Sequence, residues 1–287
     1  MSLSKIYSPD RIALSIELFP PKSDSGTSEL MKAVAELAPF RPDYFTCTYG
    51  AGGTTRDRTL EITSRVKQEF RFPVASHLTC VGSTIEQLRA YLRSAKESGV
   101  DYIVALRGDP PKGDTQFRPV PGGLRYANEL VMLIRDEFSE FGIVVAGYPE
   151  VHQEATSPES DLENLVRKVD CGADAVITQL FYDNQDFFRF RDKCVAAGIN
   201  VPIIPGLLPV LSLTQVQRIT SLCKAKLPMQ FVARLSQSQE PEWQFQVGVE
   251  HASRQAQELI AAGIPGIHFY VLNKSTATIQ ILNQLAL

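Results

Sequence analysis

The sequence predicts a (β/α)8 barrel, in which parallel strands form a central ring and helices cover the outside of the ring. Short apolar runs alternate along the chain with segments of helical periodicity, and this alternation is typical of a parallel sheet. Eight such units within 287 residues suit a barrel better than an open, doubly wound sheet. No linker rich in proline, serine or glycine divides the chain, so we expect one domain over residues 1–287.

Each predicted strand is a short run of mostly apolar residues. The runs cover residues 12–19, 44–49, 74–80, 102–106, 143–148, 175–181, 201–208 and 266–272. Helical periodicity lies between them, for example over residues 27–40, 59–70, 84–99 and 157–172.

The predicted helices have recognisable starts and ends. Ser157 is a typical helix cap, and Pro158 follows it at the first helical position. Glycines are predicted to end helices just before the next strand at positions 99, 172, 198 and 263. Residues 229–235 form an extra apolar segment before the last strand, and their pattern fits either a short strand or an inserted helix.

The composition argues against several classes of protein. The net charge of -3 and the absence of a basic run do not suit a nucleic-acid binder. Five widely spaced cysteines without a C-x-x-C pair support neither a disulfide framework nor a zinc site, and they favour a reducing cytoplasm. Neither histidine spacing nor acidic clustering suggests a catalytic metal. No apolar run reaches the roughly 18 residues of a membrane span.

Polar residues follow several of the apolar runs at the point where each strand is predicted to end. In a barrel of parallel strands the carboxyl ends all open on the same mouth, where ligands bind. A ring of hydrogen-bonding side chains at one mouth is poorly explained by packing, so these positions predict a ligand site. The residues are Thr48, Tyr49, His77, Arg107, Asp109, Tyr148, His152 and Gln179.

Glu17 lies inside the apolar run of the first strand. Burial disfavours an ionised carboxylate and favours the protonated form, which suits a group that donates a proton near neutral pH. An equally supported alternative is that Glu17 points between the barrel and the helices and pairs with a basic residue.

Arg107 and Asp109 follow the fourth strand in the sequence RGDPP. One interpretation is a salt bridge that fixes the loop, although polar residues at neighbouring strand ends favour a ligand site. Residues 49–54, YGAGGT, contain glycines that allow close approach of backbone to a ligand, but they match neither the dinucleotide nor the Walker pattern.

Taken together, several longer motifs resemble the bacterial methylenetetrahydrofolate reductase family. In chain order they are SIELFPPK, TYGAGGTTRDRT, HLTC, VALRGDPP, AGYPEVHQEA, DLENLVRKVDCGADAVITQLFYD, IIPGLLPV and HFYVLNK. The resemblance implies a flavin-dependent barrel with FAD at the carboxyl ends of the strands. Such an enzyme reduces 5,10-methylenetetrahydrofolate to 5-methyltetrahydrofolate, with NADH or NADPH as electron donor, and so supplies a methyl group for methionine synthesis.

The resemblance also implies roles for individual residues. Glu17 would be the general acid that assists opening of the folate ring, Asp109 would lie between pterin and flavin, and Gln179 would bind the pterin. Lys274 would meet the glutamate tail of folate, and Leu235 stands where related enzymes carry an aromatic residue over nicotinamide or folate. The implied flavin contacts are Thr48, His77, Leu106, Arg107, Asp109, Tyr126, Ala127, Tyr148, His152, Asp161 and Lys168.

Two other functions remain open at this stage. One is a cofactor-free lyase or aldolase that uses Lys or Glu, and the other is a binding or assembly subunit that has lost catalysis. Retention of Glu17, Asp109 and Gln179 argues against such a loss. The expected kinetics are ping-pong because one pocket serves both ligands in turn, and the donor is NADH, NADPH or a protein. We expect a homo-oligomer with small-molecule ligands and neither a nucleic acid nor a membrane as partner.

Overall fold

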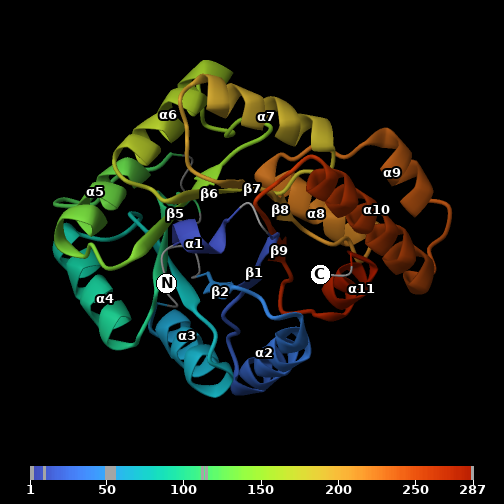
Figure 1. Ribbon diagram of the computed structural model, residues 1–287, viewed down its shortest axis with the longest axis horizontal. Helices are drawn as coiled ribbons and strands as arrows, with labels where there is room; N and C mark the ends of the chain where they lie inside the picture. Colours follow the sequence, from blue (N-terminus) through green and yellow to red (C-terminus); the bar gives the residue numbers. More distant parts are fainter. Residues whose placement is uncertain (1–2, 9–10, 49–55, 111–112, 114–115, 286–287) are drawn as a thin grey trace.

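The computed structural model describes residues 3–8, 11–48, 56–110, 113 and 116–285. Within these ranges, strand segments form one parallel sheet in the order β7-β6-β5-β4-β3-β2-β1-β9-β8. The strands are β1 (Ala13–Leu18), β2 (Tyr44–Cys47), β3 (Val74–Thr79), β4 (Tyr102–Leu106), β5 (Gly142–Gly147), β6 (Ala175–Thr178), β7 (Ile203–Ile204), β8 (Gly206–Leu207) and β9 (Gly266–Tyr270). The two ends of this order, β7 and β8, are adjacent in sequence, so the sheet closes into the predicted barrel (Figure 1).

Pro205 divides the predicted seventh strand into β7 and β8. Proline has no N–H to donate to a strand ladder, which interrupts the pairing at this position. The carbonyl of Pro205 accepts the N–H of His268 at 3.0 Å, and the N–H of Gly206 is donated to Thr178 Oγ1 at 3.0 Å. Thus β7 pairs with β6 and β8 pairs with β9, and the two halves together close the ring.

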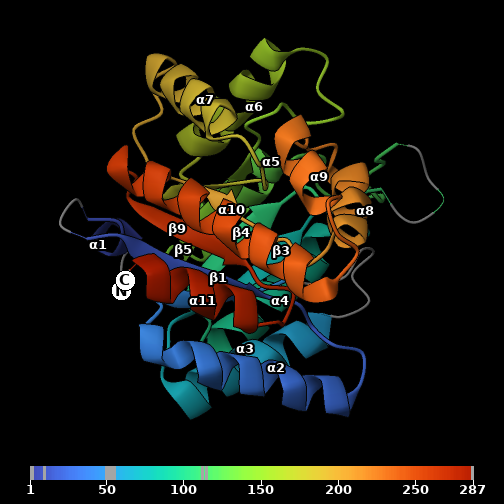
Figure 2. The same cartoon turned by 90° about the vertical axis from the view of Figure 1, so that its right-hand side faces the viewer.

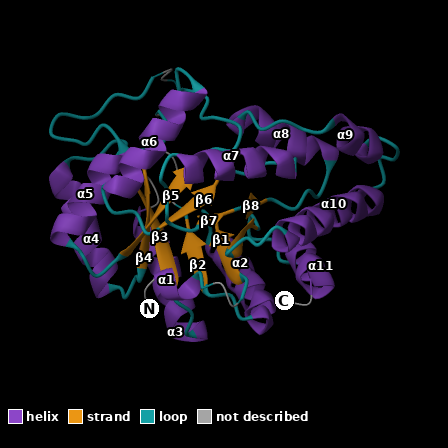
Figure 3. Cartoon of the chain, turned by 45° about the horizontal axis from the view of Figure 1, so that its top comes forward, coloured by secondary structure: helices purple, strands orange, loops and turns teal. Residues whose placement is uncertain are grey.

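All described helices except α1 surround the strands on the outside of the ring (Figure 1, Figure 3). Their bounds are α1 (Leu3–Ile6), α2 (Asp24–Leu37), the 3-10 helix η1 (Ala38–Phe40), α3 (Arg56–Phe70), α4 (Ile85–Glu97), α5 (Ala127–Glu137), α6 (Pro158–Asp170), α7 (Asn184–Ala196), α8 (Leu213–Cys223), α9 (Met229–Leu235), α10 (Pro241–Ala261) and α11 (Thr276–Leu285). The segment 229–235 is therefore a helix, and it lies beside α8 and α10 (Figure 2).

The predicted start of α6 and the predicted glycine stops are confirmed, whereas α2 and α3 each begin three residues before their predicted first residue. Ser157 Oγ accepts the N–H of Ser160 at 3.1 Å, and Pro158 occupies the first turn of α6. The four glycines predicted to end helices have positive φ, from 74° to 109°, a region that only glycine enters without a steric cost. No helix in the described ranges combines the length and the apolarity that crossing a membrane requires.

Alternate residues of each strand face two different cores. Leu14, Ile16 and Leu18 of β1 pack toward the surrounding helices, whereas Ala13 belongs to the smaller cluster inside the ring. The inner cluster also receives α1, which the sequence analysis does not predict: Leu3 and Ile6 are each 1% exposed there. Helix α1 therefore closes one end of the barrel, opposite the carboxyl ends of the strands.

Candidate functional site

Glu17 points into the barrel from the carboxyl end of β1. Side chains alternate between the two faces of a strand, so Glu17 shares the inner face with Ala13 and Ser15. The alternative that Glu17 points between barrel and helices is therefore wrong. Its side chain is 16% exposed.

Two histidines flank the Glu17 carboxylate. His77 Nε2 lies 3.3 Å from Glu17 Oε2, and His268 Nε2 lies 3.6 Å from the same oxygen. Ser15 Oγ forms a 2.8 Å hydrogen bond with His268 Nδ1, which fixes that ring. Burial lowers the pKa of His77 despite the opposing charge of Glu17, so this imidazole is neutral at neutral pH. The carboxylate thus lies between two imidazole rings, an arrangement that suits proton transfer.

Two threonine hydroxyls near Glu17 are buried without a hydrogen-bond partner in the described structure. They are Thr46 Oγ1 and Thr48 Oγ1, and Thr46 is the register partner of Glu17 in β2. A buried hydroxyl left unpaired costs about 1–3 kcal/mol, so such groups call for an explanation. Hydrogen bonding to a ligand in the barrel mouth would satisfy both.

A cavity of about 210 Å3 opens to solvent beside the ends of β4 and β5. Eight of the eleven residues implied as flavin contacts line it: Leu106, Arg107, Tyr126, Ala127, Tyr148, His152, Asp161 and Lys168. Its wall also includes Ala105, Asn128, Ala146, Glu154, Ala155 and Asn164. Of the other three implied contacts, Thr48 and His77 belong to the central group around Glu17, and Asp109 follows β4 without lining the cavity. Leu106 connects the two regions, because it also packs against the inner core.

Lys168 and Asp161 both line this cavity. Lys168 Nζ donates a 2.6 Å hydrogen bond to the carbonyl of Ala146 and lies 5.9 Å from the centre of the Tyr148 ring. Burial lowers the pKa of Lys168 to about 8, although the charge of Asp161 opposes the shift. Burial also raises the pKa of Asp161, which accepts the N–H of His152 at 3.1 Å. The cavity wall thus contains the ammonium group of Lys168, whose charge the nearby Asp161 offsets only in part.

Arg107 forms its ion pair with Glu154, and this pair replaces the salt bridge to Asp109 considered above. Two parallel hydrogen bonds of 2.8 Å join the guanidinium and the carboxylate. Asp109 is exposed. Burial and then the charge of Asp161 contribute most to the raised pKa of Tyr148, and the charge of Asp109 adds to this shift. Asp109 therefore lies close enough to act on the cavity.

Tyr270 and Gly206 shape the barrel mouth next to Gln179. The Tyr270 hydroxyl donates a 2.7 Å hydrogen bond to the carbonyl of Thr178. A Cβ added at Gly206 would come within 2.4 Å of that carbonyl and 2.6 Å of the Tyr270 ring, so only glycine fits. Gln179 follows β6 directly, and its Oε1 accepts the N–H of Leu180 at 2.9 Å.

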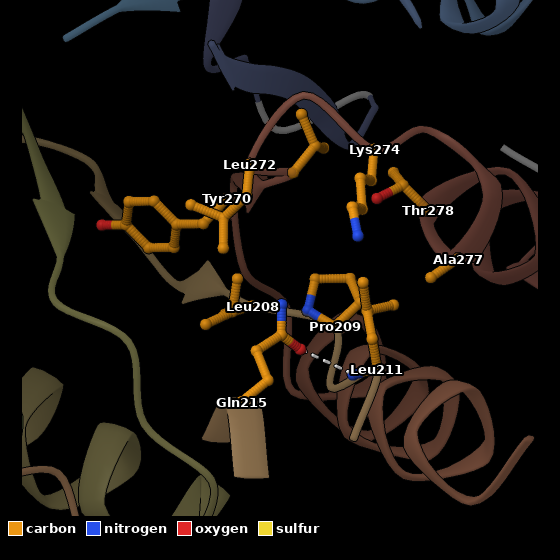
Figure 4. Close-up of a pocket in the computed structure, with 10 residues that line it drawn as sticks. Leu208, Pro209, Leu211, Gln215, Tyr270, Leu272, Lys274, Ala277 and Thr278 are labelled. Atoms are coloured by element: carbon orange, nitrogen blue, oxygen red, sulfur yellow. Dashed lines mark hydrogen bonds between the residues drawn. The ribbon is translucent and has the colours of Figure 1, made fainter. Parts of the chain in front are cut away.

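Lys274 and Leu235 differ in their access to this mouth. Lys274 is exposed and lines a small pocket together with Gln215 and Tyr270; the side chains of Lys274 and Gln215 extend into it from opposite sides (Figure 4). Leu235, the last residue of α9, is fully buried in a cluster that includes Phe231 and residues of α8 and α10. Its side chain therefore presents no surface to a ligand, which contradicts its expected position in the substrate site.

The sequence analysis assigns no role to Ser15, His268 or Glu154. The signal for Ser15 is its position two residues before Glu17, which places both side chains on one face of the strand. His268 and Tyr270 show the same alternation on β9. Glu154 gives no local signal, because only the folded loop brings it to Arg107. Residues 49–55, which include Tyr49 and the glycine-rich segment, lie outside the described residues.

Comparison with known structures supports the fold. A protein from Clostridium thermocellum, described as uncharacterized and as binding two copies of 5-methyl-5,6,7,8-tetrahydrofolic acid, superposes with a TM-score of 0.70. The match covers 100% of both chains at 14% sequence identity. At this identity the similarity concerns the barrel fold.

Comparison of sequences identifies the family. The chain is 38% identical over 277 residues to 5,10-methylenetetrahydrofolate reductase of Escherichia coli, covering 96% of this chain and 91% of that protein. It is 37% identical to methylenetetrahydrofolate reductase (NADH) 1 of Arabidopsis thaliana, where it spans 50% of the relative's length. The family model described as methylenetetrahydrofolate reductase matches residues 2–286. The chain therefore belongs to the methylenetetrahydrofolate reductase family.

Proposed function

We propose that this protein reduces 5,10-methylenetetrahydrofolate to 5-methyltetrahydrofolate, with bound FAD as cofactor and NADH as electron donor. The observation that carries the proposal is the position of Glu17, whose carboxylate lies between His77 and His268 in the barrel mouth. The names of the plant relatives, which specify NADH, support the choice of donor.

The cavity beside β4 and β5 fits an anionic flavin dinucleotide. Arg107 and Lys168 would hold the diphosphate, because guanidinium and ammonium groups form charge-assisted hydrogen bonds with phosphate oxygens. Asp161 would accept hydrogen bonds from ribose hydroxyls, and Leu106 provides an apolar surface toward the barrel centre. When bound there, the flavin would take hydride from the nicotinamide and deliver it to the methylene carbon of folate.

Glu17 would donate the proton that opens the five-membered ring of the folate substrate. The neutral His77, whose Nε2 lies 3.3 Å from Glu17 Oε2, would orient the carboxyl group. His268, held by Ser15, lies on the other side of the same oxygen and is placed to return a proton to Glu17. Asp109 at the mouth would stabilise the cationic folate species that ring opening creates.

Gln179 and Lys274 would bind the remainder of the folate. Gln179 would use its amide toward the pterin, and the exposed Lys274 would meet the negatively charged glutamate tail. The clostridial protein with the related fold is described as binding a methylated tetrahydrofolate, which supports a folate here. One mouth that serves nicotinamide and folate in turn gives ping-pong kinetics, and the methylated product would feed methionine synthesis.

An anaerobic absorption spectrum tests the function directly. We expect purified protein to show flavin bands in the visible region, to lose them on addition of NADH, and to regain them on addition of 5,10-methylenetetrahydrofolate. A colourless protein that binds no added FAD would instead favour the cofactor-free lyase or aldolase. Flavin that stays oxidised with NADH would overturn the assigned donor.

The Glu17→Gln variant separates the two half-reactions. We expect bleaching by NADH at close to the normal rate, because hydride transfer to the flavin requires no proton from Glu17. Reoxidation by the folate substrate should slow by about 10²- to 10⁴-fold, the usual contribution of a general acid. Stopped-flow absorbance measures both steps, and Glu29→Gln on the exposed face of α2 is the matched control. Normal reoxidation in Glu17→Gln would refute the assigned role.

A further inference from the structure

We propose that Glu154 is a built-in competitor for the anion-binding site at Arg107, and that it lowers the affinity of the cavity for flavins that carry phosphate. The inference rests on the proposed flavin function. Glu154 stands in the loop between β5 and α6, and both Glu154 and Arg107 line the cavity. Its carboxylate is an anionic partner of Arg107, and a phosphate group could take its place.

The guanidinium of Arg107 already has a partner along each edge. Nη1 and Nη2 donate to the two oxygens of Glu154 at 2.8 Å each, and Nε donates to the carbonyl of Gly108 at 3.2 Å. The ring of Phe117 lies 5.1 Å from the guanidinium carbon. A phosphate can form the same bidentate contact only if Glu154 gives up its place, because both anions require the same pair of N–H groups.

The charges of the cavity lining also support competition between Glu154 and a phosphate for Arg107. Its described lining contains two cationic side chains, Arg107 and Lys168, and two acidic ones, Glu154 and Asp161. The hydrogen bonds from Arg107 lower the pKa of Glu154, so this carboxylate is ionised at neutral pH. Burial lowers the pKa of His152, so that ring adds no positive charge. While Glu154 remains paired with Arg107, a diphosphate finds little net positive charge.

Release of Glu154 requires only rotation of its side chain. The backbone around it is fixed: the N–H of Glu154 is donated to His152 Nδ1 at 3.1 Å, and the N–H of Ala155 to the carbonyl of His152 at 2.9 Å. The Glu154 side chain is 35% exposed, so its carboxylate can turn into water without a large desolvation cost. The loop can therefore keep its shape while Arg107 changes partner.

Flavin binding by the Glu154→Gln variant tests the inference. Serial dilution of the flavin-loaded protein, followed by flavin fluorescence, gives the dissociation constant for FAD. Titration after removal of the flavin gives the constant for riboflavin, which lacks phosphate. We expect Glu154→Gln to bind FAD about three- to tenfold more tightly, since one competing charge near the phosphate is gone. Riboflavin affinity should not change.

The control is Glu163→Gln on α6, which changes the net charge equally at an exposed position outside the cavity lining. Equal or weaker FAD binding by Glu154→Gln would overturn the inference, because it would mean that Glu154 positions Arg107 instead of competing for it. A tighter affinity shared by riboflavin would also overturn it. Failure of both proteins to bind any flavin would overturn the proposed function, and the inference with it.

Discussion

Lys168 shows how one partly buried side chain can make the proposed binding of an anionic cofactor depend on pH. Its ammonium lies in the cavity wall with a single hydrogen bond to a backbone carbonyl, and burial lowers its pKa to about 8. The cationic form attracts an anionic ligand, whereas the neutral form does not. Near pH 8 the cavity is therefore close to losing the charge of one of its two cationic lining residues.

From this pKa we predict that FAD affinity is constant below about pH 8 and falls as the pH rises further. Above that value Lys168 must regain a proton when the phosphate binds, which weakens binding by at most about tenfold per pH unit. Fluorescence titrations between pH 6.5 and 9.5 measure the effect. Lys168→Met should bind FAD more weakly and show a flatter profile, with riboflavin as the ligand control. A constant FAD affinity up to pH 9.5 would contradict the prediction.

At the scale of single residues, the family resemblance predicts some residues of the candidate site, and only the structure reveals others. Sequence motifs named eight residues that the fold collects around one cavity, although their contacts with FAD stay predictions. Leu235 could not be placed correctly because an apolar residue in an amphipathic helix has the same pattern whether it faces the core or a ligand. Glu154 could not be found because its pairing with Arg107 joins two strand ends far apart in sequence.

At the scale of elements, helix α1 is a short segment with a specific packing role. Leu3 and Ile6 lie against the inner core, and Tyr7 just after the helix forms a 2.6 Å hydrogen bond with Tyr44. A helix of four residues has almost no stability by itself. Burial inside the strand ring must therefore hold it in place.

We predict that Ile6→Ala lowers the free energy of unfolding by about 2–5 kcal/mol, the usual cost of removing a large aliphatic side chain from a core. Urea unfolding curves measure the change. Lys5→Ala is the control, because Lys5 lies in the same helix but is exposed. FAD affinity should be unaffected, since α1 lies at the end of the barrel opposite the cavity. Equal stability of the two variants would mean that α1 contributes nothing to the core.

At the scale of the whole molecule, closure of the sheet depends on both halves of the seventh strand. β7 pairs with β6 on one side of Pro205, and β8 pairs with β9 on the other. The hydrogen bond from Tyr270 to Thr178 spans the same junction. Because the two halves together join the ends of the sheet, loss of one unit should open the entire ring.

Calorimetry should consequently show one cooperative unfolding transition for the chain, as expected of a single domain. FAD at about one hundred times its dissociation constant should stabilise the folded state by about 2.7 kcal/mol and shift the whole transition upward. Two separate transitions, of which only one responds to FAD, would contradict the single-domain prediction.

The alternation of strands and helices, the barrel, the helix ends marked by glycine and the family could all be read from the amino-acid sequence. These features are local or repeat along the chain, so apolar periodicity, caps and motifs record them directly. Which side chains meet became known only from the folded chain. Glu17 lies between His77 and His268, Leu235 is buried, and Arg107 pairs with Glu154 instead of the nearby Asp109. Each outcome depends on tertiary packing of strands, loops and helices, which brings distant residues together and which no short segment specifies.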